Sequence, residues 1–316
     1  MTRFIVRRLI AMIGVMFVIS LLTFLLFESI PNGDPARRLA GRLATANEIA
    51  FIRKEYGFDQ PIYVQYARMM KNIFTGQVYS YYQGFNVVDE VKLGLPATLS
   101  LAIGAGIIWL FTSIVVGTLA AVKAGKNTDR LLTVLSMVGV SFPPFFLGAI
   151  LIYYLGYKLN WFPLGGYVKL TSDPWQWFVH MVLPWFTLSV LFIGFYSRVL
   201  RSTILDTINE DYVRTARAKG LSENQTLRRH VLRNSLIPII TLFGLDFAQV
   251  IGGGAILTES IFNLHGIGQL AADAIGRLDI TVILVVVLLT AFFVVALAAV
   301  VDILYAFLDP RIRIAV

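Results

Sequence analysis

Long apolar segments alternate with shorter polar ones along the chain. A helix needs about 20 consecutive apolar residues to cross the hydrocarbon core of a bilayer, and several segments approach or exceed that length. The pattern predicts six membrane-spanning helices, at residues 9–30, 97–122, 131–157, 181–195, 236–257 and 280–308. We therefore expect an all-α membrane protein whose two termini lie on the same side of the bilayer.

The composition agrees with this pattern. Of the 316 residues, 57% are hydrophobic and only 15% are charged, and the mean hydropathy is +0.73, which excludes a soluble globular domain. The absence of cysteine excludes disulfides, cysteine-ligated zinc and a thiol nucleophile. The sequence has no Walker A loop, no H-E-x-x-H and no G-x-S-x-G motif, so we expect the chain neither to hydrolyse ATP nor to hold a metal.

The polar segments divide the chain into three regions. Residues 1–30 form the N-terminus and first span, residues 31–96 an external insertion, and residues 97–316 a core of five spans with a charged loop at 198–236. In the insertion, apolar residues recur at helical spacing after Asn47, which we expect to cap a helix, and a second amphipathic stretch follows. This regular spacing favours a small folded unit over a disordered tether.

Two prolines interrupt the predicted third span. Pro143 and Pro144 lie inside residues 131–157, and proline in a helix removes a backbone hydrogen bond and clashes with the preceding turn. We expect a kink or a break at this point. The sequence favours equally a hinge that lines a pathway and a simple packing kink.

Positive charge indicates which side the termini occupy. Lys and Arg number three before the first span, three in the turn after the second, eight between residues 198 and 233, and two in the C-terminal tail. The two short loops on the opposite side carry two and one. The insertion is left out of the comparison because long loops translocate largely regardless of charge. Both termini and the charged loop are therefore expected in the cytoplasm.

The charged loop has signals for two short helices. The segment from Asp211 to Lys219 is rich in Ala and Arg and has no helix breaker, and Gly220 stands where a glycine commonly ends a helix. Ser222 and Gln225 have the spacing of a capping box at the start of a second helix. Charge alone favours the simpler interpretation, a solvated basic segment that only sets membrane orientation.

The residues of this loop resemble a known motif. They read DYVRTARAKGL over 211–221, HVLRN over 230–234 and IP at 237–238. This run is similar to the EAA loop of ABC importer permeases, and most similar to that of the dipeptide, oligopeptide and nickel branch. Arg214 and Thr215 stand where the general motif has Glu and Ala, as is usual in the peptide branch.

The resemblance implies a type I ABC importer permease fold and half of a translocation pathway for peptides or similar small solutes. Such a chain pairs with a second homologous permease subunit, two ABC ATPase subunits and an extracytoplasmic solute-binding protein in the cytoplasmic membrane of a prokaryote. It needs no cofactor, because partner subunits bind ATP, and it binds no nucleic acid. The residues implied to couple to the ATPases are Arg214, Thr215, Ala216, Arg217, Ala218, Lys219, Gly220 and Leu221.

The predicted fifth span carries polar residues that suit a translocation pathway, namely Asp246, Gln249 and Gly253. A charge at mid-membrane costs about 2.5–3.5 kcal/mol on insertion scales, so Asp246 is expected to face protein or water. A single interhelical hydrogen bond explains Asp246 as well. Asp246 is also the basis of an alternative function, an ion-coupled secondary carrier, whereas no catalytic constellation for a membrane-embedded enzyme is visible.

The segment that follows is amphipathic and punctuated by glycine. It contains Glu259, Phe262, His265, Gly266 and Gly268, and it also resembles the permease family. A gate or a docking surface for the binding protein is one interpretation. A re-entrant packing element is the other.

Overall fold

The computed structural model describes residues 2–28, 35–41, 44–80 and 83–308. Within these ranges the chain is helical, with one isolated antiparallel bridge between Tyr79 and Asn86. Five helices or continuous helical runs are long and apolar enough to cross a membrane, and a bent pair makes a sixth crossing if it counts as one span. The predicted all-α membrane class is confirmed.

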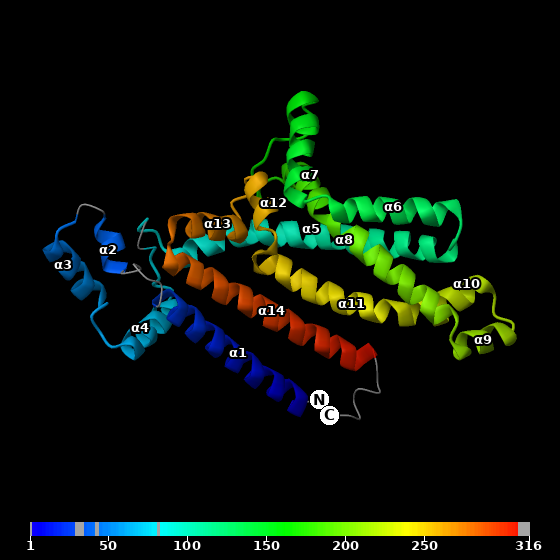
Figure 1. Ribbon diagram of the computed structural model, residues 1–316, viewed down its shortest axis with the longest axis horizontal. Coiled ribbons are helices and arrows are strands. Elements are labelled where there is room, and N and C mark those ends of the chain that lie inside the picture. Colours follow the sequence, from blue (N-terminus) through cyan, green and yellow to red (C-terminus); the bar gives the residue numbers. More distant parts are fainter. Residues whose placement is uncertain (1, 29–34, 42–43, 81–82, 309–316) are drawn as a thin grey trace.

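The five long helices are α1, α5, α8, α11 and α14, and shorter helices connect them (Figure 1). The long helices have these bounds: Thr2–Glu28, Val87–Val122, Pro174–Ile208, Leu232–Gln249 and Ile280–Leu308. The shorter ones are α2 Pro35–Ala40, α3 Ala46–Tyr56, α4 Ile62–Thr75, α6 Asn127–Ser141, α7 Pro144–Leu151, α9 Asp211–Ala218, α10 Glu223–Thr226, α12 Ile256–Ile261 and α13 Ile267–Arg277. Three π-helical turns, η1 Ile152–Lys158, η2 Leu227–Val231 and η3 Val250–Gly254, join or extend them.

The helices of the insertion start and stop at local capping signals. Thr45, not Asn47, caps α3, because its hydroxyl accepts the Glu48 N–H while the Glu48 carboxylate accepts the Thr45 N–H at 2.7 Å. This reciprocal arrangement satisfies two backbone donors that Asn47 would leave open. Gly57 ends the helix with a φ of 73°, which glycine adopts without steric cost.

The third span breaks at the prolines, as predicted. The bend between α6 and the run from Pro144 to Lys158 is 95°. Pro144 is the first residue of α7, a position where its missing N–H costs no hydrogen bond. As a result α7 turns away from the long helices and projects from the body of the molecule (Figure 1).

The fourth span differs from the prediction of 181–195, since α8 runs without interruption over 35 residues. Asp173 caps its start by accepting the N–H groups of Trp175 and Gln176, and Pro184 lies inside it without ending it. The helix continues past Arg201, which pairs with Asp129 of α6. Charge ends an apolar segment but does not end a helix, because Arg has a high helix propensity.

The fifth span also differs in its limits from the predicted 236–257. Helix α11 already begins at Leu232 and contains Pro238, and the helical run ends at Gly253, whose φ of 110° is accessible to glycine alone among common residues. The chain then turns into α12. The sixth span, α14, has the predicted bounds of 280–308.

An aromatic cluster at the centre of the bundle holds α5, α8 and α11 together. Trp109 is 0% exposed, and its ring stacks on Phe192 with 4.3 Å between ring centroids. Phe243 and Phe247 complete the cluster from α11. Close packing of α5 on α8 depends on small residues, because a Cβ at Gly117 would lie 2.7 Å from the carbonyl oxygen of Ser197.

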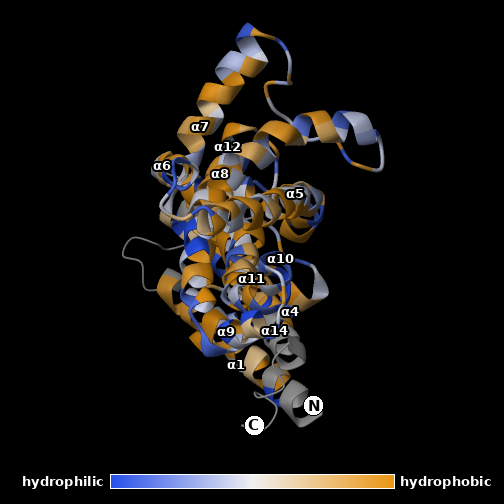
Figure 2. Cartoon of the chain, turned by 90° about the vertical axis from the view of Figure 1, so that its right-hand side faces the viewer, coloured by the Kyte–Doolittle hydropathy of each residue, from blue (hydrophilic) through white to orange (hydrophobic). Residues whose placement is uncertain are grey.

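The molecule has two distinct ends. Helices α9 and α10 lie at one end of the long axis and helices α2 to α4 at the other, while the start of α1 and the end of α14 lie between them (Figure 1). Figure 2 shows hydrophobic colour along most of the long helices and hydrophilic colour gathered around α10. This arrangement separates the charged loop from the insertion by the length of the bundle.

Candidate functional site

The charged loop forms two helices at a tight corner. Helix α9 ends next to Gly220, which has a φ of 83°, and α10 begins after Ser222. The predicted capping box is present: the Ser222 hydroxyl accepts the Gln225 N–H at 3.3 Å, and the Gln225 side chain accepts the Ser222 N–H at 3.4 Å. The structure predicted for this loop is thus confirmed.

One face of α9 is fixed to the ends of the spans. Val213 and Ala216 are buried, and Val213 belongs to the same apolar cluster as Ile204 of α8 and Ile239 of α11. Asn234, near the start of α11, donates a 2.8 Å hydrogen bond to the Tyr212 hydroxyl. These contacts join α9 to the ends of α8 and α11.

The other face of this helix pair is open. Of the eight residues predicted to couple, Ala216 packs inward and Leu221 is half-buried, whereas six are exposed: Arg214, Thr215, Arg217, Ala218, Lys219 and Gly220. Arg217 pairs with Glu223 at 2.9 Å and so braces the two helices against each other. A side chain added at Gly220 would meet no atom within 4 Å. The corner thus presents a small, unobstructed surface.

Asp246 is bonded to a tyrosine. The hydroxyl of Tyr196, a residue of α8 that is fully buried, donates a 2.6 Å hydrogen bond to the Asp246 carboxylate. Gln249 is exposed, and Gly253 is buried near Thr290 of α14. The three residues predicted to line a pathway therefore have three different environments, and their role in translocation stays a prediction.

Glu259 lies at the centre of a buried network. Its side chain is 0% exposed, and its carboxylate accepts hydrogen bonds from the Thr98 hydroxyl at 2.7 Å and from the Gln269 N–H at 2.9 Å. Thr98, on α5, in turn accepts the Ile267 N–H at 2.9 Å. Burial raises the pKa of Glu259, and the hydrogen bonds from Thr98, Gln269 and Gly268 act in the opposite direction.

Two glycines make room for this carboxylate. A Cβ at Gly266 would lie 2.4 Å from an oxygen of Glu259, and one at Gly268 would lie 3.0 Å from the same oxygen. Phe262 is buried in the central core, while His265 is exposed. The structure therefore brings Glu259, Gly266 and Gly268 together and pins the α12–α13 segment to α5, with His265 facing outward.

Sequence reasoning missed several partners in these networks. The missed partners are polar residues that lie in or beside apolar segments, and this position was the signal that could have marked them as buried and hydrogen-bonded. They are Thr98, Tyr196, Asp129 and Arg201. Arg201 donates from Nε and from one terminal nitrogen to the two oxygens of Asp129, at 2.7 Å each, and Asp129 also accepts the Gly125 N–H at 2.9 Å. These pairs could not be predicted from the sequence because their members are far apart in it. Thr98 and Glu259, for example, are 161 positions apart.

Comparisons with known proteins agree along the whole chain. Residues 113–314 match the family described as binding-protein-dependent transport system inner membrane component, and residues 1–102 match the N-terminal part described for such membrane components. The chain is 39% identical over 311 residues to the probable peptide ABC transporter permease protein y4tP of Sinorhizobium fredii, covering 98% of this chain and 99% of that protein. It is 36% identical over 314 residues to the glutathione transport system permease protein GsiC of Escherichia coli K12, covering 99% of each.

The fold has a solved counterpart. A chain of the MetNI methionine ABC transporter in an inward-facing conformation superposes with a TM-score of 0.56 at 18% identity, covering 69% of this chain and 96% of that one. This likeness concerns the fold alone and supports the type I importer permease architecture. In such transporters ATP is hydrolysed by separate ATPase subunits. The chain belongs to the family of binding-protein-dependent transport system inner membrane components, the permease subunits of ABC importers.

Proposed function

We propose that this chain forms half of the translocation pathway of an importer for peptides or peptide-like small solutes such as glutathione. A solute-binding protein delivers the solute on the outer side, and ATPase subunits drive transport from the cytoplasm. The support for the solute class is the pair of relatives described as a peptide and a glutathione permease, each matched over nearly its full length.

The observation that carries the proposal is the geometry of α9 and α10. Their buried face is part of the cluster that includes Ile204 and Ile239, so it moves with α8 and α11. Their open face surrounds Gly220, where a partner surface meets no competing side chain of this chain. A helix pair with one face fixed and the other free suits the transmission of motion from an ATPase to the spans.

The assembly contains a second homologous permease subunit, two ATPases and one binding protein. Both termini and the α9–α10 pair are cytoplasmic. The excess of Lys and Arg in these regions supports this orientation. The comparisons give no support to the alternative of an ion-coupled carrier, and the bond to Tyr196 accounts for Asp246 as an interhelical contact.

Replacement of Gly220 by Trp tests this function. The added side chain meets no atom of the chain within 4 Å of its Cβ, so it obstructs a docked partner, and the backbone strain of a side chain at a φ of 83° must be matched by a control. Gly125→Trp is a matched control, because Gly125 also has a positive φ, of 78°, with no atom within 4 Å of an added Cβ, and it lies in a different cytoplasmic turn.

The measurement is peptide uptake by cells that carry the complete importer, together with membrane level and co-purification of the ATPases. We expect Gly220→Trp to remain in the membrane at the normal level while losing both uptake and the ATPases, and Gly125→Trp to keep both. Normal uptake by the Gly220 variant would refute the docking role of this corner.

A further inference from the structure

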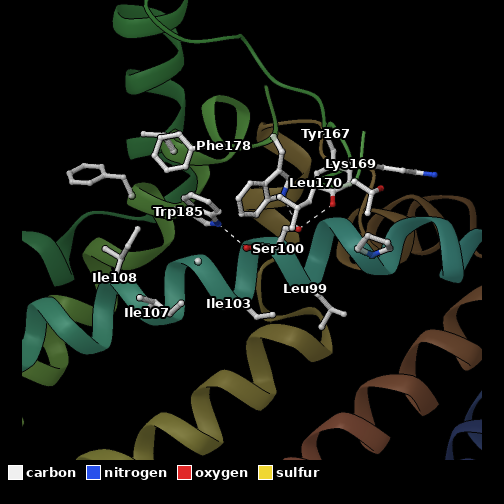
Figure 3. A pocket seen from close by; sticks show the side chains of 16 residues that line it. Leu99, Ser100, Ile103, Ile107, Ile108, Tyr167, Lys169, Leu170, Phe178 and Trp185 are labelled. Atoms are coloured by element: carbon white, nitrogen blue, oxygen red, sulfur yellow. Dashed lines mark hydrogen bonds between the residues drawn. The ribbon is translucent and has the colours of Figure 1, made fainter. Parts of the chain in front are cut away.

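A large apolar cavity lies beside the half of α5 that is remote from α9 and α10. Its volume is about 860 Å³, and its walls come from α5, from the loop before α8 and from the first turns of α8 (Figure 3). Ile103 and Ile107 form one side, Phe178 and Trp185 another, and Leu170 covers the top. None of the coupling, Asp246 or Glu259 networks uses this cavity.

The polar groups of four side chains in its wall are bonded through one residue, namely those of Ser100, Tyr167, Trp177 and Trp185. Ser100 is the common partner: its hydroxyl lies 3.1 Å from the Tyr167 hydroxyl and accepts the Trp177 indole N–H at 3.1 Å, and its carbonyl accepts the Trp185 indole N–H at 2.8 Å. Buried polar groups that are satisfied in this way need no partner from a ligand. The wall therefore selects an occupant that is apolar along its length.

The cavity has the length of one bilayer leaflet. Its residues on α5 run from Pro96 to Ile108, which corresponds to about 18 Å at the helical rise of 1.5 Å per residue. Half of the hydrocarbon core of a bilayer is about 15 Å thick. Tyr167 and Trp177 lie toward the outer end, where aromatic side chains with a polar edge favour the membrane interface.

A single cation marks the outer end of the cavity. Lys169 lies in its rim, and its side chain extends past Leu99, away from Ile107 (Figure 3). Lys169 is exposed, and within the described ranges no salt bridge is found for it. The site thus combines a leaflet-long apolar groove with a positive charge at headgroup level.

We propose that this groove binds an acyl chain of an anionic phospholipid in the outer leaflet, with the Lys169 ammonium against the lipid phosphate. An extended hydrocarbon chain is narrow enough to enter the groove, and the exposed Lys169 ammonium at its rim complements an anionic headgroup, which favours a lipid over an apolar protein helix. The lipid site is independent of the solute that the importer carries.

Native mass spectrometry of the full-length chain in mild detergent tests the lipid. The probes are phosphatidylglycerol and phosphatidylcholine with identical acyl chains. We expect the wild type to retain phosphatidylglycerol in preference, by about fivefold, since one lysine near an anionic headgroup contributes about that factor. Lys169→Glu removes the preference but not acyl binding, and Lys158→Glu, in the same connection but outside the cavity, keeps the preference.

Filling the groove tests the acyl chain. Ile103→Trp and, independently, Leu99→Trp should abolish retention of both lipids, while Phe111→Trp, at a site on α5 that is 71% exposed and outside the cavity, should change nothing. A photo-crosslinking residue at position 103, used in the intact importer in membranes, distinguishes the occupants. An adduct with lipid supports the proposal. An adduct with the second permease, or unchanged lipid retention in both Trp variants, overturns it.

Discussion

Arg201 donates two hydrogen bonds of 2.7 Å to the two carboxylate oxygens of Asp129, and these bonds join α8 to the first turn of α6. The Asp129 side chain is 6% exposed and that of Arg201 is 30% exposed. A two-pronged contact of this kind fixes direction as well as distance. It aligns the C-terminal part of α8 before the chain enters α9.

Loss of this pair should destabilise the protein. We expect Arg201→Ala to lower the free energy of unfolding by about 2–3 kcal/mol, because it leaves Asp129 as a buried charge without its main partner; the partial exposure of Arg201 keeps the loss below that of a fully buried pair. Arg198→Ala, three residues earlier on an exposed face of α8, should change it by less than about 0.5 kcal/mol. Thermal unfolding in detergent measures both. Equal losses in the two variants would contradict a specific role for the pair.

The space at Gly266 should be needed for the Glu259 network. A methyl group there would overlap the carboxylate, so we expect Gly266→Ala to cost about 1–3 kcal/mol. Gly276→Ala, inside α13, is the control, since an added Cβ there meets no atom within 4 Å, and it should be neutral or stabilising by at most about 1 kcal/mol. Protection of the α13 backbone from hydrogen exchange reports the effect locally. Unchanged protection in Gly266→Ala would show that the segment is not pinned by Glu259.

Glu259 should make stability depend on pH. Because burial raises its pKa in the folded state above the ordinary value of 4.5, the folded protein binds this proton more tightly than the unfolded chain does. The resulting stabilisation is fully present below pH 4.5 and is lost as the pH rises through the folded-state pKa.

Glu259→Gln removes this titration. Its melting temperature should therefore fall less than that of the wild type when the pH is raised from about 4 to about 8. The two profiles are compared in the same detergent, so that the other titrating groups cancel. Parallel profiles would exclude Glu259 as the source of the pH dependence.

Transport should not need the negative charge of Asp246, but stability should need its side-chain oxygen as the acceptor of the Tyr196 hydrogen bond. Asp246→Asn retains an oxygen that can accept the Tyr196 hydroxyl, so we expect uptake close to that of the wild type. Tyr196→Phe leaves the carboxylate without this donor and should cost about 1–3 kcal/mol in stability.

Uptake before and after collapse of the proton gradient distinguishes the two mechanisms. An ATP-driven importer keeps working in both conditions as long as ATP is maintained. Loss of uptake in Asp246→Asn, together with sensitivity of the wild type to the gradient, would instead support an ion-coupled carrier.

Features with local causes were predictable from the sequence. The bounds of α14, the corner at Gly220 and the capping box of Ser222 depend on hydrophobicity and on residues within one or two turns. The break at Pro143 and Pro144 has the same local origin. Such signals act within the segment that carries them, and no information about distant partners is needed to read them.

Features with distant causes were not predictable. Arg201 of α8 pairs with Asp129, 72 positions away, and the environment of Glu259 depends on Thr98, 161 positions away. Even the N-cap of α3 could not be assigned among neighbouring polar residues. Thr45 is the N-cap because it forms reciprocal hydrogen bonds with Glu48. Of the candidate site residues, the sequence identified those in the charged loop as a group but not which of them, such as Ala216, face inward.

The uninterrupted course of α8 has a mechanical consequence. Thirty-five residues of helix correspond to about 52 Å, well beyond the roughly 30 Å of a bilayer's hydrocarbon core. Trp177 and Trp185 therefore lie near the start of the same helix that has Ile204 near its end, where Ile204 packs in the apolar cluster with Val213 of α9. A tilt of this helix about its middle displaces both of its ends, so we expect a movement at the end that packs against α9 to displace the end beside the proposed lipid groove.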